Sequence, residues 1–299
     1  MARRKRGNPV DGWLIVDKPE GVTSTQAVGR ARWACDAQKA GHAGTLDPLA
    51  TGLLAVAFGE ATKTVPYAQE GLKTYRFTAR WGEATTTDDR EGEICASASA
   101  RPDRAAIEAI LPRFTGDIMQ RPPVFSAIKV EGARAYDLAR KGEEVALAAR
   151  PIHVERLALI DRPDPDHAEF EMVCGKGGYV RSMARDLGEA LGTCAHVRAL
   201  RRIASGGFTL TGAVGFEALE GLRGDPAAAA RLLPVAAGLS GLPRVDLDAE
   251  AARRLAMGEA AAAPRLDAPV YWAAHDGAPV AVLGGEGGAV RIRRVFSFG

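Results

Sequence analysis

The chain has 299 residues, 46% hydrophobic and 25% charged, an ordinary globular composition with room for one large domain and a small one, or for two moderate domains. Its net charge of +2 does not by itself indicate a nucleic-acid-binding protein, and no apolar run is long enough to cross a membrane. The four cysteines have no CxxC spacing, which argues against a zinc site and indicates reduced thiols.

The first expected elements are a strand, a helix, a loop and a second strand. The basic start, MARRKRGNPV, has no apolar segment behind it, so we expect no secretory signal and a cytoplasmic protein. Residues 12–21, GWLIVDKPEG, indicate a short buried strand that ends at a proline and a glycine turn. Residues 23–35 begin with a Thr/Ser cap and continue with apolar residues on one helical face. GHAGTLDP at 41–48 is typical of a loop, and LLAVAF at 53–58 of a buried strand.

The middle of the chain mixes alternating strands with amphipathic helices. In residues 74–81 apolar and polar side chains alternate strictly, which predicts a half-buried strand, and residues 168–175 alternate in the same way. Residues 101–114 and 176–192 have apolar residues at helical spacing, and Gly192 is placed to end the second helix. This mixture predicts an α+β fold with a mixed, largely antiparallel sheet flanked by helices.

The last part of the chain predicts a small β domain. Residues 222–244 are rich in Ala, Gly and Pro and indicate a connecting region. Beyond them, residues 269–296 contain three strand-like runs separated by DG and GG turns. We therefore expect a catalytic or binding domain over residues 1–240 and a C-terminal β domain over 241–299.

Motifs of cofactor-dependent proteins are absent from the sequence. It has no GxxxxGK[ST] loop, no GxGxxG after a strand and no GxSxG elbow. The HVE at 153–155 resembles the HxE of zinc deaminases, but no PCxxC follows it. The five histidines also lack metal-ligand spacing. The sequence therefore predicts no cofactor and no metal.

One acidic residue stands in an apolar, glycine-rich run. Asp47 lies in GHAGTLDPLATGLL, residues 41–54. A carboxylate there can act as a nucleophile that needs no cofactor, mounted rigidly by Pro48 and nearby glycines. It can equally cap a helix or turn that begins at Pro48. Composition and spacing leave both interpretations open.

The same run resembles the signature loop of the TruB family, the tRNA pseudouridine synthases that modify U55 in the TΨC arm. Further segments resemble the family in the family's order and cover most of residues 12–210. They are LIVDKPEGVTS, GEATKTVPY, KTYRFTARWGEATTTDDREGE, PPVFSAIKVEGARAYDLARKGEEV, RPIHV, CGKGGYVRSMARDLGEALG and AHVRALRRIASGGF. The resemblance implies a pseudouridine synthase fold with a small PUA-like C-terminal domain. It also implies a reaction in which the uracil is detached, turned and rejoined to the ribose through C5.

By this resemblance Asp47 is the catalytic nucleophile, Tyr75 stacks on the target base and Arg181 pairs with the aspartate. A nearby cation would lower the pKa of the Asp47 carboxyl and keep it ionised. The remaining substrate-binding positions implied by the resemblance are Tyr179, Leu200, His42, Lys18 and Asp89. His42 corresponds to the histidine that enters the RNA loop and helps to evict the base.

The resemblance implies that the partner is tRNA, bound through its TΨC stem-loop. Residues 122–152 resemble the family's thumb insertion, which would close over this part of the RNA. There, a helix in the KxxGxRAYDLARKG stretch would bring Arg134, Arg140 and Lys141 together, with Gly142 as its cap. Arginine clusters would hold phosphates; they lie at residues 2–6, 198–202 and 291–294.

Three other functions are compatible with parts of this pattern. A dyskerin-type synthase shares the aspartate loop but takes its target from a guide RNA and protein partners. An RNA-binding protein or tRNA chaperone could keep the fold without catalysis. A glycoside hydrolase would need a second carboxylate, for which residues 88–89 are the nearest candidates. A monomeric enzyme with no membrane attachment and no obligatory protein partner is favoured.

Overall fold

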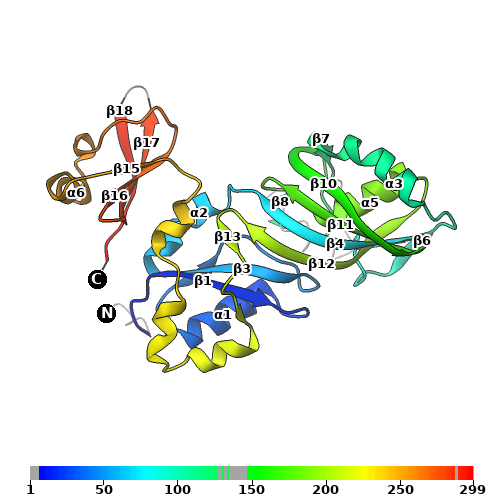
Figure 1. Cartoon of the computed structure of the whole chain (residues 1–299), viewed down its shortest axis with the longest axis horizontal. Coiled ribbons are helices and arrows are strands. Elements are labelled where there is room, and N and C mark those ends of the chain that lie inside the picture. The colour runs from blue at the N-terminus through cyan, green and yellow to red at the C-terminus, as the bar shows by residue number, and fades with distance from the viewer. Residues whose placement is uncertain (1–6, 127–128, 131–132, 135–146, 287–288, 299) are drawn as a thin grey trace. The chain divides into compact units, whose positions relative to one another are not determined.

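The computed structural model describes residues 7–126, 129–130, 133–134, 147–286 and 289–298, and shows an α+β fold, as expected (Figure 1). It divides into two compact units: residues 1–71 with 204–299, and residues 72–203. Unit 1 thus holds both ends of the chain, and unit 2 is the part between them. In the part of the chain that is described, no helix is long and apolar enough to cross a membrane.

Two buried antiparallel strands form the centre of unit 1. β1 (Gly12–Lys18) pairs with β3 (Thr51–Phe58), and β2 (Ala40–His42) also pairs with β3. β14 (Val214–Gly215) adds a parallel partner to β1. Both faces of β1 and β3 are covered, which explains why their sequences are continuous apolar runs and do not alternate. Helix α1 (Ser24–Ala34) packs on one face with its buried alanines, and Thr23 and Gln26 form a capping box at its start.

The other face of β1 and β3 is covered by short helical segments and by the C-terminal sheet. Trp13 and Leu53 lie in one core cluster with Trp272, Val282 and Phe296. The shorter elements of unit 1 are η1 (Gly59–Lys63), α2 (Val65–Ala68), β13 (Phe208–Thr209), η3 (Glu217–Leu222), η4 (Pro226–Arg231) and η5 (Val235–Leu239). The connecting region at 222–244 is therefore a chain of 3₁₀ turns with buried side chains of its own.

The C-terminal sheet contains the three expected strands and one more. Its order is β15 (Arg244–Asp246), β16 (Tyr271–His275), β17 (Ala278–Glu286), β18 (Ala289–Val295), with β15 parallel to β16 and the others antiparallel. The expected DG turn joins β16 to β17, with positive φ angles of 49° at Asp276 and 78° at Gly277. The short segments α6 (Ala249–Ala256) and η6 (Ala260–Ala262) lie in the same region, and α6 buries Leu255 in this sheet's own cluster.

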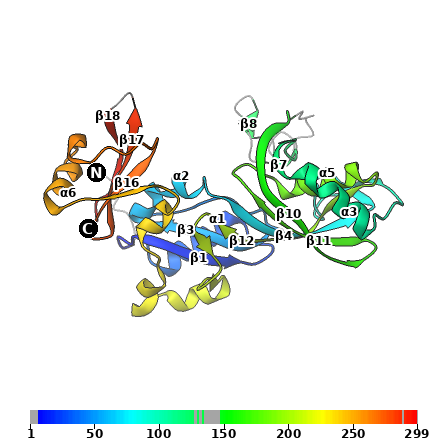
Figure 2. The same cartoon turned by 45° about the horizontal axis from the view of Figure 1, so that its top comes forward.

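Unit 2 is built on a sheet whose strand order is β12 (Ala195–Ser205), β4 (Lys73–Trp81), β11 (His167–Cys174), β10 (Arg150–Asp164), β7 (Gly116–Gln120). In this sheet β4, β11, β10 and β7 pair antiparallel. Helix α5 (Val180–Ala190) packs against β4, and α3 (Arg104–Ile110), continued by η2 (Leu111–Phe114), packs against β10 (Figure 2). Two hairpin-like pairs complete it: β5 (Glu83–Thr85) with β6 (Ile94–Ser97), and β8 (Lys129–Val130) with β9 (Ala133–Arg134).

The prediction of a helix in the thumb segment is wrong at the beginning of that helix. Lys129–Val130 and Ala133–Arg134 pair as antiparallel strands, where the KxxGxRAYDLARKG pattern favoured a helix. Residues 135–146, which include Arg140, Lys141 and Gly142, lie outside the described residues.

Candidate active site

Asp47 lies in the loop that joins β2 to β3. Its side chain is half-buried, and Leu46 and Leu49 beside it are buried in the core. The amide of Ala50 donates to the carbonyl of Asp47 at 3.1 Å, so a tight turn follows the aspartate. No helix begins at Pro48, and the helix-cap interpretation of Asp47 is therefore wrong, while a turn is present.

Lys18 fixes the residue that follows Asp47. It is fully buried at the end of β1, and its Nζ donates to the carbonyls of Val22 at 2.7 Å, Pro19 at 2.9 Å and Pro48 at 3.3 Å. The amide of Gly21 donates to the same Pro48 carbonyl at 2.9 Å. A buried ammonium tied to three carbonyls is a rigid anchor, so Lys18 positions the aspartate loop from one side. His42, half-buried at the end of β2, precedes the loop.

Tyr75 lies on β4 opposite Met172 of β11. The alternation expected from the sequence is confirmed, because Phe77 and Trp81 on the same face are buried. Phe77 stacks on Phe170 of β11 at 5.1 Å between ring centroids. Tyr75 itself is only half-buried, which leaves part of its ring at the edge of this aromatic core.

Tyr179 is the N-cap residue of α5, and its backbone is held by a side chain from β7. The buried Gln120 accepts a hydrogen bond from the Tyr179 amide at 2.8 Å and donates to the Tyr179 carbonyl at 3.1 Å. Because Tyr179 makes no side-chain cap of its own, Gln120 satisfies one of the amides at the start of the helix. Sequence reasoning missed Gln120, since a lone glutamine between Met119 and Arg121 carries no signal of burial.

The first turns of α5 hold two loops of unit 2. Arg181 donates to the carbonyls of Thr87 at 3.1 Å and Phe125 at 3.0 Å, and its Nε lies 3.7 Å from Oδ2 of Asp89. Ser182 and Arg185 both donate to the carbonyl of Arg121. One helix end therefore anchors both the acidic loop and the start of the segment expected to bind RNA.

Asp88 and Asp89 have different environments although they are neighbours. Asp88 accepts a hydrogen bond from Arg185 at 2.8 Å, and burial raises the pKa of its carboxyl despite that cation. Asp89 is more deeply buried and accepts hydrogen bonds from the Thr87 hydroxyl at 2.6 Å and the Glu91 amide at 3.0 Å. Asp88 thus ties the loop to α5, whereas Asp89 holds the loop together from within.

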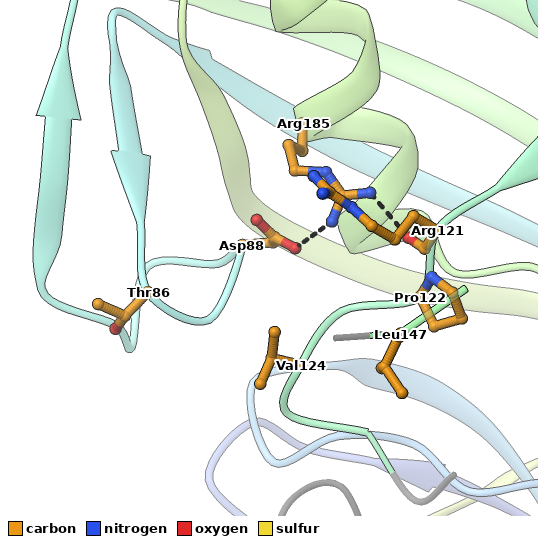
Figure 3. Close-up of a pocket in the computed structure, with 7 residues that line it drawn as sticks. All are labelled: Thr86, Asp88, Arg121, Pro122, Val124, Leu147 and Arg185. Atoms are coloured by element: carbon orange, nitrogen blue, oxygen red, sulfur yellow. Dashed lines mark hydrogen bonds and ion pairs between the residues drawn. The ribbon is translucent and has the colours of Figure 1, made fainter. Parts of the chain in front are cut away.

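A pocket of about 290 Å³ opens beside this cluster. Figure 3 shows Arg185 hydrogen-bonded to Asp88, with the Arg121 side chain alongside. The remaining residues that line the pocket are Thr86, Pro122, Val124 and Leu147. The pocket therefore combines two guanidinium groups with an apolar wall.

Leu200 and the arginines next to it lie on strand β12. Leu200 is buried, and Arg202 is only 1% exposed, so Arg202 has no free surface to offer a phosphate. The expectation that the whole 198–202 cluster binds RNA is therefore wrong for Arg202, whereas Arg198 is exposed. Arg198 and Arg202 are four positions apart on β12 and so share a face of the strand, yet only Arg202 is buried; the compositional cluster does not reveal this difference.

The residues expected at the site fall into two groups. Tyr75, Asp89, Tyr179, Arg181 and Leu200 belong to unit 2. Asp47, Lys18 and His42 belong to unit 1.

The described residues contain no candidate metal site, and two of the four cysteines have thiols whose pKa is raised by burial. No group of three His, Cys, Asp or Glu in the described ranges could hold a metal ion. Burial raises the pKa of the Cys174 thiol to about 12 and also raises that of Cys35, so both stay protonated at neutral pH.

Family models and similar proteins of known name both point to the same family. Residues 32–180 match the model of the TruB family pseudouridylate synthase N-terminal domain, and residues 181–239 match that of the tRNA pseudouridylate synthase B C-terminal domain. The chain is 53% identical to a tRNA pseudouridine synthase B of Dinoroseobacter shibae, over 100% of this chain and 99% of that one. It is 58% identical to the protein of the same name from Roseobacter denitrificans, over 86% of this chain and 85% of that one.

A solved structure shares the fold at much lower identity. A chain in the crystal structure of a Cbf5–Nop10–Gar1 complex has a TM-score of 0.73 and 22% identity, covering 99% of this chain and 91% of that one.

Proposed function

The chain belongs to the TruB family of tRNA pseudouridine synthases, and from that membership we propose that it converts uridine 55 in the TΨC arm of tRNA to pseudouridine, with Asp47 as the catalytic carboxylate. The observation that carries the proposal is the aspartate's mounting. Lys18 and the turn closed by Ala50 fix the backbone around Asp47, while its half-buried side chain is not used as a helix cap. A carboxylate held in this way suits a covalent or electrostatic role at an electrophilic carbon.

Arg181 is proposed as the cation that pairs with Asp47, as the family resemblance implies. Its burial and its three fixed partners in unit 2 support a preorganised guanidinium, because little freedom remains to be lost when a further carboxylate is bound. Lys18 and Asp89 are proposed to act indirectly. Lys18 holds the aspartate loop, and Asp89 orients Arg181.

Tyr75, Tyr179, Leu200 and His42 are proposed to receive the flipped base. Chemistry at C1′ and C5 of a stacked uridine requires extrusion at a cost of a few kcal/mol. Stacking on an aromatic ring recovers about 1–3 kcal/mol per base, and the half-buried ring of Tyr75 is suited to it. Leu200 would pack on the base, and His42 would enter the RNA loop from which the base leaves.

RNA binding is proposed to use residues 122–152 and exposed arginines. Arg121 and Arg185 line a pocket at the start of that segment, and Arg291 and Arg293 are exposed on β18 of the C-terminal sheet. We propose residues 1–240 as the catalytic domain and 241–299 as a PUA-like domain that contacts RNA elsewhere. Phosphate contacts of this kind make affinity fall steeply with salt.

We propose a monomer that acts without guide RNA or obligatory protein partner. The relatives that are more than half identical are named tRNA pseudouridine synthase B, whereas the Cbf5 complexes share only the fold. A tRNA chaperone without catalysis would keep binding but need no catalytic carboxylate.

Tritium release from a [5-³H]uridine-labelled tRNA transcript tests the proposal. The purified chain alone should release tritium, a transcript with cytidine at position 55 should give none, and Asp47→Asn should bind tRNA normally without releasing tritium. Binding without release by the wild-type chain would leave a chaperone. Release that persists with cytidine at position 55 would refute the assignment of the target.

A further inference from the structure

Ser24 makes a reciprocal pair of hydrogen bonds to the residue just before Asp47. Its Oγ donates to the carbonyl of Leu46 at 2.9 Å and accepts from the amide of Leu46 at 2.8 Å. Ser24 is the first residue of α1, 22 positions away in sequence, and only 4% exposed. One buried hydroxyl thus uses both its donor and an acceptor lone pair on a single backbone residue.

These bonds constrain the peptide group on which Asp47 is mounted. The Leu46 carbonyl belongs to the peptide whose nitrogen is that of Asp47, so its direction fixes the entry of the chain into the aspartate. On the other side, Lys18 and the Gly21 amide hold the Pro48 carbonyl. The segment that ends β1 and begins α1 therefore grips the loop both before and after Asp47.

Helix capping does not account for the Ser24 hydroxyl. Thr23 caps α1, since its Oγ1 accepts from the Gln26 amide at 3.1 Å while the Gln26 side chain accepts from the Thr23 amide at 2.8 Å. The two adjacent hydroxyl residues thus have separate tasks. Thr23 serves the helix, and Ser24 serves the aspartate loop.

We propose that Ser24 is a positioning residue for pseudouridine formation, acting through Leu46 to hold the Asp47 carboxylate in its reactive place. The inference rests on the proposed role of Asp47. Without the hydroxyl, the Leu46 amide and carbonyl lose their partner in a buried site, and the loop must shift to find another. A displacement of about 1 Å at a catalytic group can cost about 10²-fold in rate.

The test compares Ser24→Ala with Thr23→Ala in the full-length chain. Both remove a hydroxyl from the first turn of α1, but only Ser24→Ala frees Leu46. We measure the single-turnover rate of tritium release at saturating enzyme, and tRNA affinity by filter binding. The rate of Ser24→Ala should fall about 10- to 100-fold. Thr23→Ala should keep its rate within about threefold, and tRNA affinity should change little in either variant, because neither residue is proposed to contact RNA.

Rates for Ser24→Ala within threefold of Thr23→Ala would overturn the proposal, as would a loss confined to tRNA affinity. If Ser24→Ala shows no cooperative unfolding transition, Ser24→Cys decides by the same criteria, since it keeps a side chain of similar shape with a much weaker hydrogen-bonding group. A wild-type chain that binds tRNA without releasing tritium would instead refute the proposed function, and the Ser24 proposal with it.

Discussion

Arg181 and Asp89 form an ion pair that is almost completely removed from water. Nε and Oδ2 are 3.7 Å apart, and the side chains are 6% and 5% exposed. The guanidinium also donates to the Thr87 and Phe125 carbonyls, so the pair joins α5 to both of the loops beside it. The cation proposed to serve Asp47 is therefore oriented by a second carboxylate, and Asp89 is proposed to act on the site through Arg181.

Asp89→Asn should destabilise the chain markedly. Breaking a buried pair leaves Arg181 without its counter-charge, which costs about 3–5 kcal/mol when one partner is removed. The asparagine can still accept the hydrogen bonds from Thr87 and Glu91. We therefore expect a loss at the lower end of this range, about 3 kcal/mol in the free energy of unfolding measured with urea. Glu108→Gln is the control, because its ion pair with Arg104 is half exposed and should contribute under about 1 kcal/mol. Equal losses in the two variants would contradict this account.

Gln120→Ala should weaken the start of α5 and the placement of Tyr179. It removes both hydrogen bonds to the Tyr179 backbone in a site that is 2% exposed, for which we expect about 1–3 kcal/mol lower stability. Gln120→Glu keeps an acceptor for the Tyr179 amide but buries a carboxylate against the Tyr179 carbonyl, so it should be no more stable than Gln120→Ala. The measurements are urea unfolding and KM for tRNA. An alanine variant as stable as the wild type would show that water replaces the amide.

Phe296→Ala should destabilise unit 1 although it lies three residues from the end of the chain. Phe296 is 5% exposed in the cluster that contains Trp13, and truncation of a buried Phe costs about 3–5 kcal/mol. Phe298, which stacks on Phe296 but is 47% exposed, provides the matched control, with at most about 1 kcal/mol expected from Phe298→Ala. Similar small effects from both would mean that the C-terminal sheet contributes little to this core.

His153 should make stability depend on pH. Its Nδ1 lies 2.7 Å from Asp117 and its Nε2 3.2 Å from Glu155, and hydrogen bonds to these carboxylates raise the pKa of the imidazole above its usual 6.5. A raised pKa means that the stabilisation is fully present below pH 6.5 and disappears as pH rises through the folded-state pKa. His153→Gln should thus lose most stability relative to wild type at a pH of about 5.5 and least at about 8.5. Urea unfolding of both proteins at the two pH values measures it. A pH-independent difference would exclude the ion pairs as its cause.

Elements with strong local signals were predictable from the sequence. The Thr/Ser cap marked the start of α1, strict alternation marked β4, and the Asp276–Gly277 turn marked the join of β16 to β17. β10 was not predicted, because bulges between Val154 and Arg156 and again after Leu159 interrupt its period of two. The thumb helix was predicted wrongly at 129–130 and 133–134, where pairing between β8 and β9 overrides local helix propensity.

The sequence by itself determined the family and the identity of the candidate residues, because it contains the family's motifs in the family's order. Tertiary structure decided what holds those residues. Ser24 meets Leu46 across 22 positions and Gln120 meets Tyr179 across 59, and neither pair has a local pattern that announces it. Periodicity and caps act within a few residues, whereas these contacts form only when β1, α1, β7 and α5 are packed in place. The chemistry can therefore be inferred from motifs, but the residues that position it are visible only in the folded chain.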